Sequence, residues 1–213
     1  MTEFVTHDTK RFVVEKPENY IFKPGQATEL SINKSSWENK KRPFTFSSLN
    51  EDKVLEFTIK IYPEHNGVTE QLGKLYPGDQ LILRDIWGTI SYKGPGVFIA
   101  GGAGITPFIA IFRDLREKNQ LQGNKLLFSN KISKDIILEK EFKEMLGENA
   151  IFILTREKKN SYEHGRINKE FLQKHINDFS QNFYICGPMQ FIVDVKKALD
   201  ELGAKPESVV IEM

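Results

Sequence analysis

Residues 97–107 read VFIAGGAGITP, and this stretch decides how the second half of the chain folds. The apolar run Val97–Ala100 is typical of a buried strand, and three of the next four residues are glycine. Thr106 is a good helix N-cap, and Pro107 suits the first position of a helix. The stretch therefore predicts a strand, a tight glycine turn and a helix, in that order.

Such a turn can hold a phosphate group. Glycines let the backbone approach a pyrophosphate closely, and the helix N-terminus supplies N–H donors and a positive potential. The spacing here is Gly-Gly-x-Gly, which differs from the dinucleotide-binding pattern Gly-x-Gly-x-x-Gly. Taken alone, the segment leaves a second interpretation open, in which the glycines serve only a tight turn packed on the sheet.

The rest of the second half alternates between apolar runs and helical patterns. This alternation predicts a parallel sheet with helices on both faces. We expect strands at 97–100, 126–129, 151–155, 183–185 and 208–212, and helices at 107–118, 136–146, 169–179 and 190–202.

The first half has a different pattern, with short alternating runs separated by turn residues such as Lys23-Pro24-Gly25. We expect strands at 11–15, 27–32, 54–61 and 80–84. Short strands at this spacing predict an antiparallel barrel or sandwich. Residues 1–95 then form this antiparallel unit and residues 96–213 an α/β parallel-sheet domain, with Gly94-Pro95-Gly96 as the hinge.

Composition narrows the classes of partner. The 30 Lys and Arg residues against 29 Asp and Glu leave a net charge of +1, which removes the main electrostatic argument for nucleic acid. The single cysteine, Cys186, excludes an internal disulfide and the usual cysteine-ligated iron–sulfur and structural zinc sites. The four histidines show no ligand spacing, so no metal site is predicted.

Membrane and export signals are not expected. Residues 94–112 carry no charge, but their glycines and prolines favour a strand, turn and helix over a membrane span. The N-terminal residues MTEFVTHDTK have no apolar core typical of a secretory signal. A cytoplasmic setting is therefore our default expectation.

Residues 42–48, RPFTFSS, form a candidate ligand-binding strand. Pro43 cannot donate to a strand ladder, so this strand is expected at a sheet edge. Arg42 offers a guanidinium fork for phosphate, Phe44 a flat face for a ring system, and Thr45 a hydroxyl. The alternative is a barrel strand with a surface arginine and two core phenylalanines.

Four segments, taken in order, resemble the ferredoxin–NADP reductase superfamily over nearly the whole chain. They are 42–45, the turn Gly67-Val68-Thr69, the glycine turn 101–107 and Cys186-Gly187-Pro188-Met189. The resemblance implies that a flavin-binding antiparallel barrel precedes a nicotinamide-nucleotide domain. Each motif alone is weak evidence for the family. The resemblance rests on finding all four in the family's order, each on the expected type of strand, turn or helix.

For the flavin, the resemblance implies roles in the Arg42-Pro43-Phe44-Thr45 segment. Arg42 would hold the flavin phosphate, and Phe44 stands where the family has a tyrosine that stacks on the isoalloxazine ring. Thr45 stands where a serine hydroxyl faces the hydride-accepting nitrogen. The N–H and hydroxyl groups of Gly67, Val68 and Thr69 would bind a diphosphate, which favours FAD over FMN.

For the nicotinamide cofactor, the resemblance implies a pyrophosphate site and a ring site. The pyrophosphate would bind at Gly101, Gly102, Ala103, Gly104, Thr106 and Pro107, where Ala103 replaces a family threonine. Cys186 would lie beside the nicotinamide carbon that gives up hydride, within the second nucleotide segment that continues through Gly187, Pro188 and Met189. A buried, inert thiol is the other interpretation of Cys186.

Two departures from the family pattern affect the site. The chain ends Val210-Ile211-Glu212-Met213, whereas family members often end in an aromatic that covers the flavin. Glu212 matches an acidic residue near the family's C-terminus, so we group it with Thr45 and Cys186 as candidate catalytic residues.

The choice between NADPH and NADH is the second departure. The second strand of this half ends Ser129-Asn130-Lys131, without the acid that often meets a free ribose. Thr155-Arg156-Glu157 resembles a family Ser-Arg-Glu segment whose arginine can hold a 2′-phosphate, which favours NADPH slightly over NADH. A solvated strand end would carry the same residues.

The resemblance implies an FAD-dependent NAD(P)H reductase that passes electrons singly to a separate flavodoxin, ferredoxin or oxygenase component. The basic run Lys40-Lys41-Arg42 could dock an acidic carrier, or could simply be solvated. Two alternatives remain open: a non-catalytic flavin- or nucleotide-binding regulatory subunit, and a ferric-chelate reductase.

Overall fold

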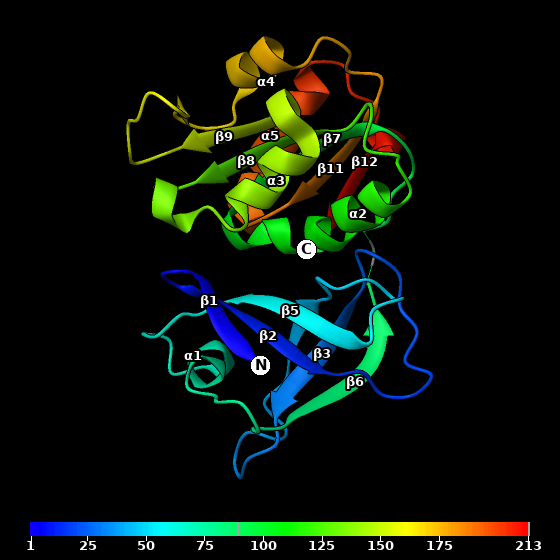
Figure 1. Cartoon of the computed structure of the whole chain (residues 1–213). Coiled ribbons are helices and arrows are strands. Elements are labelled where there is room, and N and C mark those ends of the chain that lie inside the picture. The colour runs from blue at the N-terminus through cyan, green and yellow to red at the C-terminus, as the bar shows by residue number, and fades with distance from the viewer. Residues whose placement is uncertain (89, 213) are drawn as a thin grey trace. The chain divides into compact units, whose positions relative to one another are not determined.

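The computed structural model describes residues 1–88 and 90–212, with Glu212 described by its backbone alone. The chain divides into two compact units, whose elements are drawn in Figure 1. The first unit comprises Met1–Thr89 and Thr106–Asp114, and the second comprises Ile90–Ile105 and Leu115–Met213. Helix α2 (Thr106–Glu117) is thus shared between them. The functional division into 1–95 and 96–213 stays a prediction.

The first unit contains two three-stranded antiparallel sheets. Their strand orders are β1-β2-β5 and β4-β3-β6. Among the described residues, hydrogen bonding therefore gives two antiparallel sheets, which confirms the antiparallel architecture expected for this half, while the barrel itself stays a prediction. The strands are β1 (Thr2–Thr6), β2 (Thr9–Glu15), β3 (Ala27–Ile32), β4 (Arg42–Thr45), β5 (Val54–Lys60) and β6 (Leu81–Trp87), with the short helix α1 (Val68–Gly73) between β5 and β6.

Strand β4 is a short edge strand for a local reason. This strand has only four residues, and Pro43 among them has no N–H to donate. One further backbone bond, from Phe46 N–H to the carbonyl of Gln26, extends the pairing with β3 past the end of β4. The Phe46 ring is fully buried, and it stacks on Phe22 with ring centroids 4.1 Å apart. Apolar packing, more than a continuous ladder, therefore holds this part of the unit.

The second unit is built on a six-stranded parallel sheet of order β10-β9-β8-β7-β11-β12, as the alternating pattern predicted. From β7, the chain adds β8 and β9 on one side and later β11 and β12 on the other. The strands are β7 (Gly96–Gly101), β8 (Lys125–Asn130), β9 (Ala150–Leu154), β10 (Glu163–His164), β11 (Asn182–Cys186) and β12 (Val209–Glu212).

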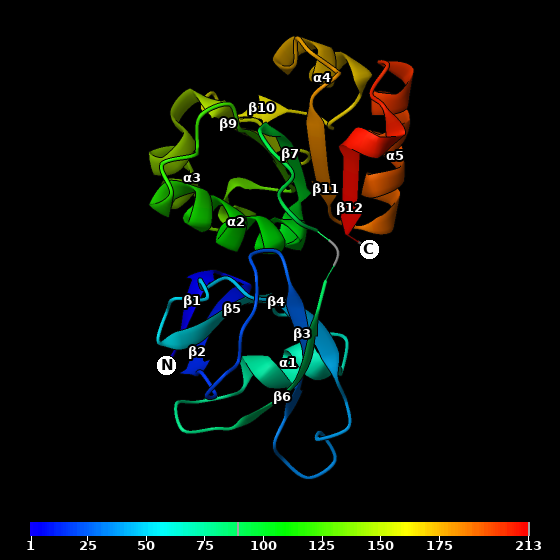
Figure 2. The same ribbon diagram turned by 90° about the vertical axis from the view of Figure 1, so that its right-hand side faces the viewer.

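Helices cover both faces of this sheet (Figure 2). On one face, α4 (Lys169–His175) and α5 (Met189–Glu201) pack on a fully apolar core that includes Ile99 and Leu127. On the other, α3 (Glu139–Leu146) places Phe142 edge-on against Phe128. The connections include four 3-10 turns: η1 (Gly102–Ile105), η2 (Ser133–Asp135), η3 (Gly147–Asn149) and η4 (Pro206–Ser208).

Two helix boundaries differ from expectation. Helix α3 begins at Glu139, three residues late, because Leu138 before it takes a left-handed backbone with φ of 52°. Helix α4 ends at His175, well before Phe179, because Ile176 is already extended. Of the described helices, none is long and apolar enough to cross a membrane.

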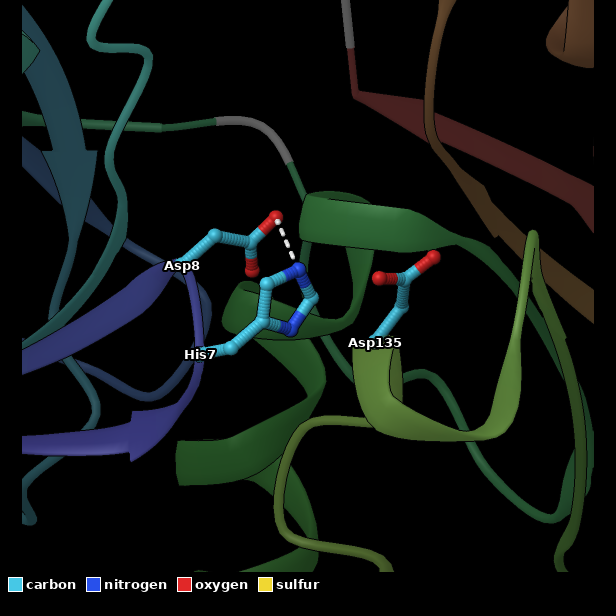
Figure 3. Close-up of side chains that lie close together, drawn as sticks. All are labelled: His7, Asp8 and Asp135. Atoms are coloured by element: carbon cyan, nitrogen blue, oxygen red, sulfur yellow. Dashed lines mark ion pairs between the residues drawn. The ribbon is translucent and has the colours of Figure 1, made fainter.

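The turn between β1 and β2 carries a charged cluster. His7 Nε2 lies 3.7 Å from Asp8 Oδ2, as the dashed line in Figure 3 marks. Burial favours a higher pKa for Asp8, but the Lys60 ammonium, 2.8 Å away, holds the pKa of this carboxyl below its usual value. The third side chain in the figure, Asp135, belongs to η2 of the second unit.

Lys10 closes the C-terminal end of α1. Lys10 is a buried residue of β2, and its ammonium donates to the carbonyls of Gly73 at 3.1 Å and Leu75 at 2.8 Å. Lys10→Met should lower the free energy of unfolding by about 1–3 kcal/mol, because two carbonyls lose a charged donor. Urea unfolding would measure this. The exposed control Lys53→Met should change it by less than about 0.5 kcal/mol, and equal effects would contradict the role of Lys10.

Candidate functional site

The strand order reverses between β7 and β11. After β7 the chain moves outward to β8, and it returns later to place β11 on the other side of β7. Open α/β sheets bind ligands outside the carboxyl ends of the strands at such a reversal. The glycine turn η1 leaves the end of β7, and Cys186 ends β11, directly opposite Ala100. The two predicted nucleotide segments therefore meet here.

Gly104 lies in close backbone contact with the second segment. A Cβ at this position would be 2.3 Å from the carbonyl oxygen of Cys186 and 2.6 Å from Cα of Gly187. Gly187 is itself confined, since its Cβ would be 2.7 Å from the ring of Phe191. Only glycine fits at these positions, so the sequence Gly-Gly-x-Gly and the Cys-Gly pair are parts of one packed turn.

Gly102 faces the other way. It has φ of +54°, and no atom lies within 4 Å of where its Cβ would be. The turn thus presents bare backbone to open space, as a phosphate-binding turn must. Thr106 is the first residue of α2 and not its N-cap, because η1 already turns the chain helically before it; Pro107 follows in the first turn, and Ala103 is half-buried within η1.

A cavity of about 370 Å³ lies at the carboxyl ends of β8 and β9. This volume is in the range of small-ligand sites. Ser129 and Thr155 contribute to it from strand ends, Arg166 from the segment before α4, and Gln190 and Phe191 from α5. The strand-end rule could have found Ser129, whereas nothing in the local sequence singled out Arg166, Gln190 or Phe191.

Backbone hydrogen bonds join the two segments beyond β8 and β9. Thr155 N–H donates to the Asn130 carbonyl and Arg156 N–H to the Lys131 carbonyl, both at 2.9 Å. The Arg156 and Lys131 side chains are exposed. The Asn130 carboxamide is buried, and within the described part of the chain neither of its polar atoms has a hydrogen-bond partner.

Glu157 fixes this edge further. Its Oε2 accepts from Ser133 N–H at 2.6 Å, and its Oε1 lies 3.1 Å from the Lys159 ammonium. The hydrogen bonds from Ser133, helped by Lys159, lower the pKa of Glu157 to about 2. The one acid of the Thr155-Arg156-Glu157 segment is therefore engaged within the protein, while the neighbouring cations remain at the surface.

In the first unit, β4 is an edge strand, as Pro43 predicted. Arg42 is exposed and donates to the carbonyl of its neighbour Lys41 at 2.8 Å, and Phe44 is half-buried. Thr45 is buried, and its hydroxyl has no hydrogen-bond partner among residues 1–88 and 90–212. A buried hydroxyl without a partner costs free energy unless a ligand satisfies it.

The second predicted flavin segment precedes α1. Gly67 is the N-cap residue with φ of −109°, which any residue could adopt, Val68 is buried and Thr69 half-buried. Helix α1 packs against β3, the strand that pairs with β4. The two segments predicted to bind flavin, 42–45 and 67–69, therefore both lie next to β3.

The three candidate catalytic residues come from different strands. Thr45 ends β4, and Cys186 is half-buried at the end of β11. The backbone of Glu212 pairs with Cys186 across β11 and β12, but the Glu212 side chain lies outside the described residues, as does Met213. Pro188 and Met189 follow Cys186 and start α5, where Met189 is exposed.

Substituting Gly104 tests the packed turn. Gly104→Ala should destabilise the protein by about 2–3 kcal/mol, because the added methyl meets backbone atoms that cannot move aside. Gly102→Ala is the matched control and should cost about 1 kcal/mol, from its left-handed backbone alone. Equal losses in chemical denaturation would contradict the close contact at Gly104.

Comparison with known proteins gives one family model and many relatives. Residues 98–197 match the model of the oxidoreductase NAD-binding domain. NADH-cytochrome b5 reductase 2-A of Vanderwaltozyma polyspora is 28% identical over 218 residues, covering 89% of this chain and 70% of the relative. NADH-cytochrome b5 reductase 3 of Rattus norvegicus is 27% identical, covering 89% of this chain and 76% of its own.

Solved structures share the fold. A ferredoxin NADP+ reductase from Neisseria gonorrhoeae with bound FAD and NADP has a TM-score of 0.84 at 19% identity, covering 99% of this chain and 94% of its own. The FAD/NAD-binding domain of nitric oxide dioxygenase from Vibrio cholerae has a TM-score of 0.85 at 18% identity, covering 100% and 94%. Residues 98–197 thus match the oxidoreductase NAD-binding domain, the chain is similar over most of its length to NADH-cytochrome b5 reductases, and its fold is that of ferredoxin reductase-like proteins.

Proposed function

We propose that the chain binds FAD in its first unit and NADPH in its second, and passes electrons to a separate acceptor protein. The observation that carries the proposal is the Thr45 hydroxyl, buried on an edge strand without a protein partner among the described residues. A flavin ring nitrogen would supply the missing partner. Arg42 and Phe44 on the same strand offer a phosphate fork and an aromatic face, so these residues fit a flavin.

The residues of the second unit fit a dinucleotide. The backbone N–H groups at Gly102 to Gly104 would hold the pyrophosphate, with Gly101 and the Gly187-Pro188 pair supporting the turn. The cavity lined by Ser129, Thr155 and Arg166 would take the nucleoside at the far end. Cys186, at the strand reversal, would lie beside the nicotinamide ring.

NADPH is the cofactor that the charges favour. A free ribose often meets a carboxylate, but Glu157 is engaged by Ser133 and Lys159. Arg156 and Lys131 are exposed cations joined by a backbone hydrogen bond, and they could receive a 2′-phosphate together. The relatives quoted above are named for NADH, so this chain would differ from them in its preference.

A flavin held by the residues of β4 would supply the redox chemistry, that is, hydride acceptance and one-electron transfer. The protein contributes orientation. Phe44 would hold one face of the flavin ring, and the Thr45 hydroxyl would donate a hydrogen bond to the hydride-accepting nitrogen. Cys186 and Glu212, paired through their backbones, would shape the nicotinamide side.

The acceptor would be a flavodoxin, a ferredoxin or an oxygenase component. One solved structure with this fold, at 22% identity, is the Amycolatopsis cytochrome P450 reductase GcoB. In the basic run, Lys41 is neutralised by Glu29, whereas the Lys40 ammonium lies 4.2 Å from the centre of the Trp37 ring. Lys40 is therefore the better candidate for docking an acidic carrier. The cytoplasmic location stays a prediction.

A visible spectrum recorded before and after adding NADPH under nitrogen tests the proposal. Bound flavin should be present and should bleach. Thr45→Ser should keep the reduction rate within a few-fold, whereas Thr45→Val should lower it about 10–100-fold through loss of the hydroxyl. Protein that takes up no flavin, even with added FAD, would refute the proposal. Bound flavin that neither NADPH nor NADH bleaches would favour the non-catalytic regulatory subunit. Electron transfer to ferric chelates, but to no carrier protein, would favour the ferric-chelate reductase.

Cofactor preference depends on Arg156. Arg156→Ala should raise KM for NADPH about tenfold, the loss expected for one charged contact to phosphate, and should change KM for NADH less than twofold. The control Arg116→Ala removes an exposed arginine of α2 whose partner is Glu117, and it should change neither KM. Equal changes with both cofactors would contradict a 2′-phosphate site at Arg156.

A further inference from the structure

We propose that Arg113 and Glu56 are positioning residues that hold the flavin strand, so that the Thr45 hydroxyl keeps one orientation. The inference rests on the proposed function, and it concerns residues of the first unit only. Arg113 belongs to the part of α2 that packs within this unit, and Glu56 lies on β5.

Glu56 is the centre of a buried charged cluster. It is only 7% exposed. Its Oε1 lies 2.6 Å from Nη1 of Arg113 and accepts a hydrogen bond from the Ser47 hydroxyl at 3.0 Å. Its Oε2 lies 2.7 Å from Nε of Arg11 on β2. A carboxylate this buried is retained only with such partners, and removing one of them leaves an uncompensated charge.

Ser47 is the residue that this cluster fixes. The same Nη1 of Arg113 donates to the Ser47 carbonyl at 2.7 Å, and the Ser47 N–H donates to the Glu56 carbonyl at 2.8 Å. The Ser47 hydroxyl also accepts from Thr58 at 3.1 Å. Every polar group of Ser47, which is fully buried, is therefore engaged.

Thr45 lies two residues before Ser47, and side chains two apart in an extended chain share a face. Strand β4 ends at Thr45, and one further bond, from Phe46 N–H to the Gln26 carbonyl, completes its pairing with the β3 side, so this pairing does not reach Ser47. The Thr45 hydroxyl has no protein partner among the described residues to orient it. Its orientation therefore depends on the backbone that follows, which the Glu56–Arg113 pair attaches at Ser47.

The guanidinium is suited to this task. One nitrogen of Arg113, Nη1, donates to both a carboxylate and a carbonyl, and the planar guanidinium fixes the directions of its two N–H bonds. A lysine would keep the charge and lose the fixed direction. The flavin environment should therefore respond in a graded way to Arg113→Lys and Arg113→Met.

The experiment compares Arg113→Met, Arg113→Lys and Ser47→Ala with the control Arg116→Met on the same helix. Four quantities are measured: the FAD dissociation constant, the visible circular dichroism of bound flavin, its limiting reduction rate at saturating NADPH, and the unfolding temperature without FAD. Arg113→Met should lower the limiting rate per bound flavin about tenfold or more and change the dichroism. The NADPH concentration for half-maximal rate should move less than about twofold, because the nucleotide site is untouched.

Arg113→Lys should restore the rate to within about threefold of wild type, and Ser47→Ala should lower it about three- to tenfold. Arg116→Met should leave all four quantities unchanged. If the variants only unfold at lower temperature, while bound flavin keeps its dichroism and rate, the pair is merely structural and the inference fails. Should Arg113→Met not fold, Arg113→Lys and Ser47→Ala decide. Wild-type protein that binds no FAD would instead refute the proposed function itself.

Discussion

The close approach of Gly104 to the carbonyl of Cys186 is the constraint on which the second unit depends. With 2.3 Å between that oxygen and any added Cβ, the two turns can meet only as bare backbone. Neighbouring strands β7 and β11 bring them to one edge of the sheet, where the strand order reverses. Phe191 packs against both Gly101 and Gly187, which closes the turn from the helix side. This bare-backbone turn before α2 is the feature on which we base the proposed pyrophosphate site.

In the first unit, the feature that matters is how strand β4 is held in place. Strand β4, where we propose that the flavin binds, is short, lies at an edge and contains a proline, and β3 is its one strand partner among the described residues. Just after β4, Ser47 is held by a buried charged cluster that consists of Glu56, Arg11 and Arg113. This arrangement makes the position of Thr45 sensitive to side chains that would not themselves touch a flavin.

Much of this fold follows from periodicity and turn residues. The strand at 27–32 and the start of α5 near 190 match their expected bounds closely, and Pro43 predicted an edge strand. Chain order cannot reveal that β11 returns beside β7, because this pairing depends on packing across the whole sheet. Strand β10 has only two residues, too few for a periodic pattern. The left-handed backbone at Leu138, which delays the start of α3, could not be predicted either, because leucine rarely adopts that conformation.

The site was predictable only in part, for similar reasons. Glycine spacing identifies the turn, but the engagement of Glu157 by Ser133 depends on two loops far apart in sequence. Arg113 and Glu56 read as an ordinary helix charge and an ordinary strand charge, and only the fold brings them to Ser47. Long-range contacts of this kind have no local sequence signature.

A crystal structure of the protein with FAD and NADP+ would test the central claim most directly. We predict a flavin ring on Phe44 with its hydride-accepting nitrogen within hydrogen-bonding distance of the Thr45 hydroxyl, and a pyrophosphate on the N–H groups of Gly102 to Gly104. A flavin bound away from β4, or a nucleotide bound away from the glycine turn, would contradict the account.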